Sequence, residues 1–289
     1  MNPRFSRKVI GFLFYLPLIA LVVGFFAYLL ASSIFISFKN VLFGGMAAAK
    51  FVGFSNYIEL FFSRDFWYSM RFSFIFGITT AFLELALGFL LAYYFYSKFR
   101  GSKFLFTFLI SPMFIAPSLF GLMNRILFNN FIGLIPGYVR SLFGISVDFF
   151  HPNNIFWTLV GIDLLQWTPF LFLIIYAALL GIPIQLIEAA SIDGAGRFQK
   201  VVNIVLPYIK PALISGGFLR FIESFRSFDS IYVLTGGGPG SLTTTISIFI
   251  YRTSFTMGNQ GLSSAAGILL FLVMLFPLFL ASKVMRKEW

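Results

Sequence analysis

The sequence predicts an all-α integral membrane protein with about six transmembrane helices. Of its 289 residues, 59% are hydrophobic and only 11% are charged, whereas about a quarter of the residues of a soluble domain are charged. So few polar residues cannot cover a water-facing surface, so the chain is expected to lie in a membrane. Long apolar runs recur along the sequence, separated by loops that carry lysine and arginine, which indicates several membrane-spanning helices.

The first apolar run, residues 9–38, is longer than the ~20 residues that cross a bilayer core. It follows Arg4, Arg7 and Lys8, as the apolar region of a signal peptide would, but that region has only about 7–15 residues. We therefore expect a retained helix. Five further spans are expected at residues 69–96, 104–123, 155–180, 209–225 and 262–282.

The positively charged loops predict how these helices are oriented. Basic residues gather at the N-terminus, near residue 100, between residues 183 and 207, and at the C-terminus. By the positive-inside rule this side is cytoplasmic, and an even number of spans puts both termini there. Beyond the N-terminal group, the residues concerned are Lys98, Arg100, Lys103, Arg197, Lys200, Lys283, Arg286 and Lys287. We expect residues 1–68 to form the N-terminal helix and first outer loop, and residues 69–289 to form a five-helix core.

Known catalytic and nucleotide-binding motifs are missing from the sequence. The sequence has no G-x-x-x-x-G-K-[ST] phosphate loop, no H-E-x-x-H or G-x-S-x-G pattern and no EF-hand loop. It has no cysteine, which excludes disulfides and thiolate metal sites. The formal net charge of +11 is explained by membrane topology, so no nucleic-acid partner is expected. We expect no catalytic residue, no metal and no cofactor in this chain.

Residues 188–207, EAASIDGAGRFQKVVNIVLP, interrupt the apolar sequence. Pro183 suits the first turn of a short helix that ends near Ile192, where Asp193-Gly194 is a turn signal. A second helical piece follows and is expected to close at Leu206-Pro207. Its apolar residues recur at three- and four-residue spacing and are Phe198, Val201, Val202, Val205 and Leu206. On this pattern alone, the segment is either a knob that docks on another protein or a plain amphipathic interfacial helix.

The spacing E-A-A, three residues, G, nine residues, I-x-L-P is complete in this stretch and resembles the cytoplasmic EAA loop of permease subunits of bacterial ATP-binding cassette (ABC) importers. Other segments are similar to the maltose/glycerol-phosphate (carbohydrate uptake) type of permease over nearly the whole chain. These segments are FVGFSNYIELF (51–61), residues 90–122 and FDSIYVLTGGGPGSLTTTI (228–246). The chain departs from that type at Met123-Asn124-Arg125, where many relatives have a tryptophan before the arginine, and it lacks the large external insertion of the maltose permease.

The resemblance implies the type I ABC importer permease fold, with a cytoplasmic coupling helix and a multi-pass location in a bacterial inner membrane. It implies docking of ABC ATPase subunits, two per complex, which would bind ATP and Mg²⁺. It also implies a second, non-identical permease and an extracytoplasmic solute-binding protein. The substrate would be a sugar or sugar-like solute, with an oligosaccharide, an acidic polysaccharide and glycerol phosphate all open. The implied ATPase-docking residues are Glu188, Ala189, Ala190, Asp193, Gly194, Ile204, Leu206 and Pro207.

Polar residues inside the predicted spans are candidates for the substrate pathway, because such residues are costly in a membrane and often functional. Asp163, Gln166 and Trp167 are spaced at i, i+3 and i+4, so they share a helix face. An aromatic plane beside an amide and a carboxylate suits a sugar, although the same groups could instead hold helices together. Further candidates are Glu84, Arg220, Glu223, Arg226 and Asp229. No pattern in the sequence pairs the carboxylates of the different spans.

Two other functions remain open at this point. An ATP-independent secondary transporter or channel would use the segment 183–207 merely as an interfacial helix, although the sequence shows no internal repeat of the kind common in such transporters. A membrane assembly protein would move no solute at all.

Overall fold

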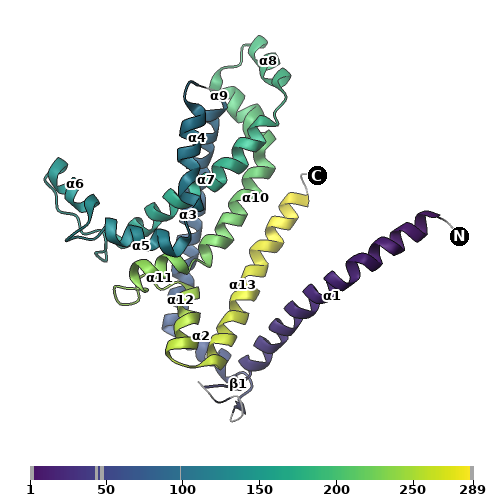
Figure 1. The fold of residues 1–289 in the computed structure, drawn as a ribbon, viewed down its shortest axis with the longest axis vertical. Coiled ribbons are helices and arrows are strands. Elements are labelled where there is room, and N and C mark those ends of the chain that lie inside the picture. The colour runs from purple at the N-terminus through teal and green to yellow at the C-terminus, as the bar shows by residue number, and fades with distance from the viewer. Residues whose placement is uncertain (1–2, 43–44, 46–48, 98, 287–289) are drawn as a thin grey trace. The chain divides into compact units, whose positions relative to one another are not determined.

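The computed structural model describes residues 3–42, 45, 49–97 and 99–286. Lys98 and Lys287, which contribute to the predicted orientation, lie outside the described residues. The described chain is mainly helical, which confirms the predicted fold class (Figure 1). Its helices are α1 (Pro3–Ser37), α2 (Ser55–Phe62), α3 (Arg64–Tyr96), α4 (Ser102–Ile110), α5 (Pro117–Leu127), α6 (Leu134–Phe143), α7 (Ile155–Leu180), α8 (Ile184–Ile192), α9 (Arg197–Lys200), α10 (Leu206–Phe225), α11 (Asp229–Thr235), α12 (Ile246–Tyr251) and α13 (Gln260–Arg286).

The chain forms two compact units. The first consists of Met1–Ser63 and Ile250–Val273, and the second of Arg64–Phe249 and Met274–Trp289. The predicted division at residue 68 stays a prediction. In the first unit, the two-residue strands β1 (Lys39–Asn40) and β2 (Lys50–Phe51) pair antiparallel. The side-chain amide of Asn56 donates hydrogen bonds to the carbonyl oxygens of Ser37 (2.7 Å) and Lys39 (3.0 Å), which joins α2 to the end of α1.

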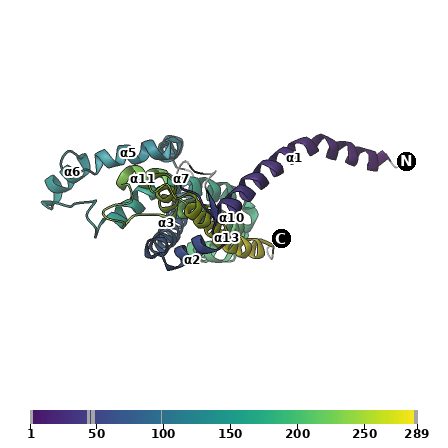
Figure 2. The ribbon, with the colours of Figure 1, turned by 90° about the horizontal axis from the view of Figure 1, so that it is seen from below.

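Helices α3, α7 and α10 pack side by side and form the centre of the second unit (Figures 1 and 2). Their contact buries two apolar clusters, one around Phe76 and Leu159 and the other around Phe172 and Leu179. Glycine permits the close approach, as small residues do between membrane helices. A Cβ atom on Gly88 of α3 would lie 3.1 Å from the backbone nitrogen of Phe172 on α7.

Within the described residues, five helical segments are long and apolar enough to cross a membrane. They are Tyr15–Ser37, Arg64–Tyr96, Ile155–Leu180, Arg197–Phe225 and Gln260–Phe279. A sixth span is present if the bent pair Ser102–Phe114 and Pro117–Leu127 is counted as one. The expectation of about six spans is therefore confirmed with that pair included.

The span expected at 104–123 is bent and not one straight helix. Helix α4 runs into a 3₁₀ turn, Ser111–Phe114, and the chain then bends by 101° before α5 begins at Pro117. Proline lacks a backbone N–H and disfavours helical geometry in the residue before it. Ala116 accordingly has φ −57° and ψ 135°, which is not helical. The local steric effect of Pro117 thus overrides the apolar pattern.

The predicted closure of the second loop helix at Leu206-Pro207 is also wrong. The chain continues from α9 through a π-helical turn, Val201–Val205, directly into α10. The Leu206 N–H donates to the carbonyl oxygen of Val201, five residues earlier, just before Pro207 would disrupt a normal helical turn. Because this wider turn breaks the 3.6-residue period, the predicted apolar stripe does not share one face: Val205 is buried, whereas Phe198 and Val202 are exposed.

Candidate functional site

The loop between α7 and α10 contains the two short helices that the sequence predicts, and α8 ends at the predicted turn. Gly194 has φ +76°, a conformation that glycine adopts without the strain a side chain would bring. The Gly194 N–H donates to the Ser191 carbonyl (3.2 Å) and the Ala195 N–H to the Ala190 carbonyl (2.9 Å), the hydrogen-bond pair of a Schellman cap. Pro183 occupies the N-cap position of α8, one residue before the predicted place.

Side chains fix α9 relative to α8. The Lys200 ammonium donates to the Ser191 hydroxyl (2.8 Å), and that hydroxyl donates to the Ile187 carbonyl (2.7 Å). The Gly196 N–H donates to the side-chain oxygen of Gln199 (2.8 Å), which satisfies a free donor at the start of α9. The loop is therefore a defined structure and not a disordered linker.

The surface of this loop is exposed and partly apolar. No residue of α8 is buried, and Figure 1 shows α8 beyond the ends of α7 and α10. Ile192 is 87% exposed and Phe198 is 80% exposed. Among the predicted docking residues, Glu188, Ala189, Asp193, Gly194 and Pro207 are exposed, and Ala190, Ile204 and Leu206 are half-buried. Their role in docking stays a prediction.

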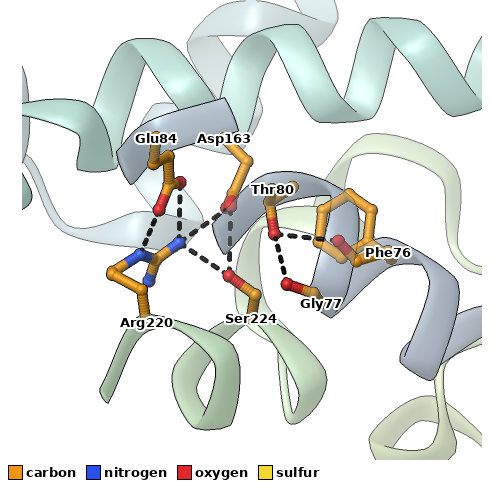
Figure 3. Close-up of polar contacts among 7 residues, drawn as sticks. All are labelled: Phe76, Gly77, Thr80, Glu84, Asp163, Arg220 and Ser224. Carbon is orange, nitrogen blue, oxygen red and sulfur yellow. Dashed lines mark hydrogen bonds and ion pairs between the residues drawn. The ribbon is translucent and has the colours of Figure 1, made fainter. Parts of the chain in front are cut away.

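A buried ionic cluster joins α3, α7 and α10 (Figure 3). The Arg220 guanidinium donates from Nε to Oε2 of Glu84 (2.5 Å) and from Nη2 to Oε1 of Glu84 (2.9 Å). Nη2 also donates to Asp163 Oδ2 (2.9 Å) and to the Ser224 hydroxyl (2.8 Å). Glu84 is fully buried and Arg220 is 2% exposed, so the cluster lies out of water. The folded chain therefore pairs carboxylates of different spans that no sequence pattern pairs.

The three residues predicted to share a face of α7 have different partners. Trp167 lies 5.0 Å from the Arg220 guanidinium, measured to the ring centroid, a cation–π distance. The Gln166 amide, which is 1% exposed, donates to the Ile115 carbonyl (2.9 Å) at the break before α5. Gln166 therefore supports the bent span, while Asp163 and Trp167 face the region of Arg220.

A cavity of about 290 Å³ opens beside the cluster. Glu223 and Arg226 line it as an exposed ion pair (2.9 Å), and exposed Asp229 begins α11. Five of the six predicted pathway residues, all except Gln166, line this one cavity. Its full lining is Pro117, Asp163, Trp167, Arg220, Glu223, Ser224, Arg226, Ser227, Phe228, Asp229 and Ser230. Contact between the predicted pathway residues and the substrate stays a prediction.

The glycine-rich segment after α11 is a hydrogen-bonded turn. The Thr243 hydroxyl donates to the Gly238 carbonyl (2.8 Å), and the Thr244 hydroxyl donates to the Gly237 carbonyl (3.2 Å). The Thr245 hydroxyl bonds the Ser227 carbonyl (2.9 Å), which ties the turn to the chain just after α10. The threonines therefore hold the chain beside the cavity in place.

Several apolar spans, a polar cavity among them and a projecting loop define a membrane transport protein. Residues 84–287 match the family of binding-protein-dependent transport system inner membrane components. The chain belongs to this family, and it is a permease subunit.

Curated relatives share most of the chain. The trehalose/maltose transport system permease protein MalF of Thermococcus litoralis is 34% identical over 275 residues, 94% of this chain and 92% of the relative. The sn-glycerol-3-phosphate transport system permease protein UgpA of Yersinia enterocolitica is 31% identical over 95% of this chain and 93% of its own length. A solved bacterial ABC transporter involved in the import of the acidic polysaccharide alginate has the same fold, with a TM-score of 0.83 at 21% identity, covering 98% of this chain and 99% of that chain.

Sequence reasoning identified Arg220 and Glu84 as candidates but did not assemble the cluster, and it missed Ser224. The available signal was the presence of rare charged residues inside three different spans, each of which needs a partner in a membrane. Their separation of 57 and 136 residues from Arg220 gave no indication of which would meet.

Proposed function

We propose that the chain forms part of the translocation pathway of an ATP-driven importer for a sugar or sugar-like solute. The family supports the transport role, and the names of the trehalose/maltose and glycerol-phosphate relatives support the substrate class. This chain's share of the pathway would include the cavity beside Arg220, whose walls carry carboxylates, hydroxyl groups and an indole ring. Such groups suit the hydroxyls and the apolar ring faces of a sugar.

The exposed, defined loop α8–α9 is the observation that carries the mechanism. One of the two ABC ATPase subunits of the complex would dock on it, and these subunits would bind the ATP and Mg²⁺ that this chain has no phosphate loop to hold. Ile192 and Phe198, each at least four-fifths exposed, would supply apolar contact area, and the Schellman cap at Gly194 would hold α8 at a fixed angle. Because α9 continues into α10, movement of the docked loop would reach Arg220 and the cavity wall through one helical run.

The remaining partners follow from the same proposal. A second, non-identical permease would complete the pathway, and an extracytoplasmic solute-binding protein would deliver the solute. The α8–α9 loop and both termini would lie on the cytoplasmic side of a bacterial inner membrane, in accord with the basic residues there.

The first experiment is gentle detergent extraction of the tagged native complex and mass identification of the chains that co-purify. A P-loop ATPase and a second permease with an EAA loop are the expected partners. Recovery of the chain alone, with solute transport retained and driven by an ion gradient, would instead identify an ATP-independent transporter.

The docking role is then tested with Glu188→Lys. We expect loss of ATP-driven uptake with the chain still present in the membrane, because the substitution reverses a charge on the exposed surface of α8. Glu59→Lys makes the same charge change at an exposed position of α2 and is the matched control. Equal uptake by both variants and the unmodified protein would disprove the docking role of Glu188.

A further inference from the structure

The charged groups of the cavity beside α10 do not favour an anion. Its walls carry the carboxylates of Asp163, Glu223 and Asp229 against the guanidinium groups of Arg220 and Arg226. A fourth carboxylate, Glu84, contacts Arg220 from behind the wall. Four carboxylates therefore face two guanidinium groups.

The positive charge of Arg220 is already compensated. Its Nε and Nη2 donate to both Glu84 oxygens and to Asp163, at 2.5–2.9 Å, and the side chain is only 2% exposed. An incoming phosphate or uronate would have to displace one of these carboxylates and leave it buried without a partner. Leaving a buried charge uncompensated is strongly unfavourable.

Arg226 is the more accessible cation of the wall, and it is also paired. Its Nη2 donates to Glu223 Oε1 at 2.9 Å, with the two side chains 62% and 51% exposed. Asp229 is exposed at the start of α11, and within the described part of the chain no hydrogen bond or ion pair joins it to a cation. An anion entering the cavity thus meets an uncompensated carboxylate and no uncompensated guanidinium.

Building on the transport role proposed above, we infer that this cavity accepts a neutral polyhydroxylated solute and rejects phosphorylated or uronate-bearing ones. Hydroxyl groups donate to carboxylates such as Asp229 and exchange hydrogen bonds with the Ser227 and Ser230 hydroxyls. A neutral solute brings no charge that must be desolvated, whereas an anion in this partly buried site is repelled at reduced dielectric. The cavity thus discriminates between the substrate classes that the family leaves open.

The test uses the assembled complex, purified with its partner chains, and measures the midpoint of thermal unfolding as solute concentration rises. The probes are a set of neutral mono- and disaccharides that includes trehalose and maltose, together with sn-glycerol 3-phosphate and an alginate pentasaccharide. A ligand that binds the folded state raises this midpoint. We expect a rise with at least one neutral sugar, at concentrations about tenfold or more below those at which either anion acts.

Two variants connect the preference to the cavity. Asp229→Lys supplies the uncompensated cation that the wall lacks, so glycerol 3-phosphate should now raise the midpoint. Asp229→Asn removes the repulsion without adding a cation. It should therefore narrow the difference between the concentrations at which neutral and anionic probes raise the midpoint. Glu59→Lys, which changes an exposed carboxylate that does not line the cavity, should leave the preference as it is in the unmodified complex.

The inference is overturned if either anion stabilises the unmodified complex as well as the neutral sugars do, or if no neutral sugar stabilises it. It is also overturned if both Asp229 variants keep the original preference. Measuring solute uptake into proteoliposomes tests the substrate class and the importer function separately. ATP-driven uptake of an anion would disprove the neutral substrate class and leave the importer function standing, whereas uptake that does not depend on ATP would disprove the importer function.

Discussion

Replacing Arg220 with glutamine should destabilise the chain more than replacing its partner Glu84. The variant removes the cation that contacts Glu84 and Asp163, both of which are at most 6% exposed. It leaves two neighbouring carboxylates without a counter-charge. Breaking a buried ion pair by removing one partner costs about 3–5 kcal/mol, and we expect Arg220→Gln to fall in that range.

Glu84→Gln is the informative comparison. It leaves Arg220 paired one-to-one with Asp163 at 2.9 Å, and the new amide oxygen can still accept a hydrogen bond from the guanidinium. The loss is therefore close to that of one hydrogen bond to a charged group, about 1.5–3 kcal/mol. Arg226→Gln, which breaks the exposed pair with Glu223, is the matched control and should cost about 0–1 kcal/mol.

The assay is unfolding in mixed micelles by titration with SDS, followed by tryptophan fluorescence, to which Trp167 beside Arg220 contributes. The expected order of destabilisation is Arg220→Gln, then Glu84→Gln, then Arg226→Gln. A combined variant that also neutralises Glu84 and Asp163 should recover part of the loss caused by Arg220→Gln. If Arg220→Gln is no worse than Glu84→Gln, or if the combined variant recovers nothing, buried charge does not explain the stability of this cluster.

Three further substitutions test local geometry. Gly194→Val forces a β-branched residue to φ +76° and should abolish ATP-driven uptake while the chain stays in the membrane. Gly196 has φ −70°, so the control variant Gly196→Ala should keep normal uptake. Gly88→Val places a branched side chain against the backbone of α7 and should lower the midpoint of thermal unfolding of the complex. The control is Gly24→Val on α1, which should lower this midpoint much less because a Cβ atom there meets no neighbour. Gln166→Leu leaves the Ile115 carbonyl without its donor and should cost about 1–3 kcal/mol in SDS unfolding; an unchanged midpoint would show that the amide does not support the bend.

The sequence was sufficient for those features that depend on composition or on single residues. The number of spans follows from apolar length, and the end of α8 follows from Asp193-Gly194, because glycine there satisfies a backbone requirement that can be read locally. The similarity of the segment 188–207 to a known loop identified the family that residues 84–287 match.

Features that depend on competition between local and distant effects could not be read in this way. The apolar run 104–123 hides a break because hydropathy does not register the steric demand of Pro117. The π turn before Pro207 changes the number of residues per turn within the helical run from α9 to α10. A pattern extrapolated at 3.6 residues per turn therefore assigns residues to the wrong helix faces. The partners of Arg220 are fixed by which faces of α3 and α7 pack together, and a single sequence read by itself holds no record of that packing.

The exposed apolar side chains of α8 and α9 have a consequence for how the protein must be produced in the cell. Ile192 and Phe198 lie on a loop that projects beyond α7 and α10. Without a partner, this loop exposes an apolar surface to water. A subunit made in excess would carry this surface uncovered, open to aggregation and to recognition by quality-control proteases. Balanced synthesis with the subunit that covers the loop is therefore expected to set how much of this permease accumulates.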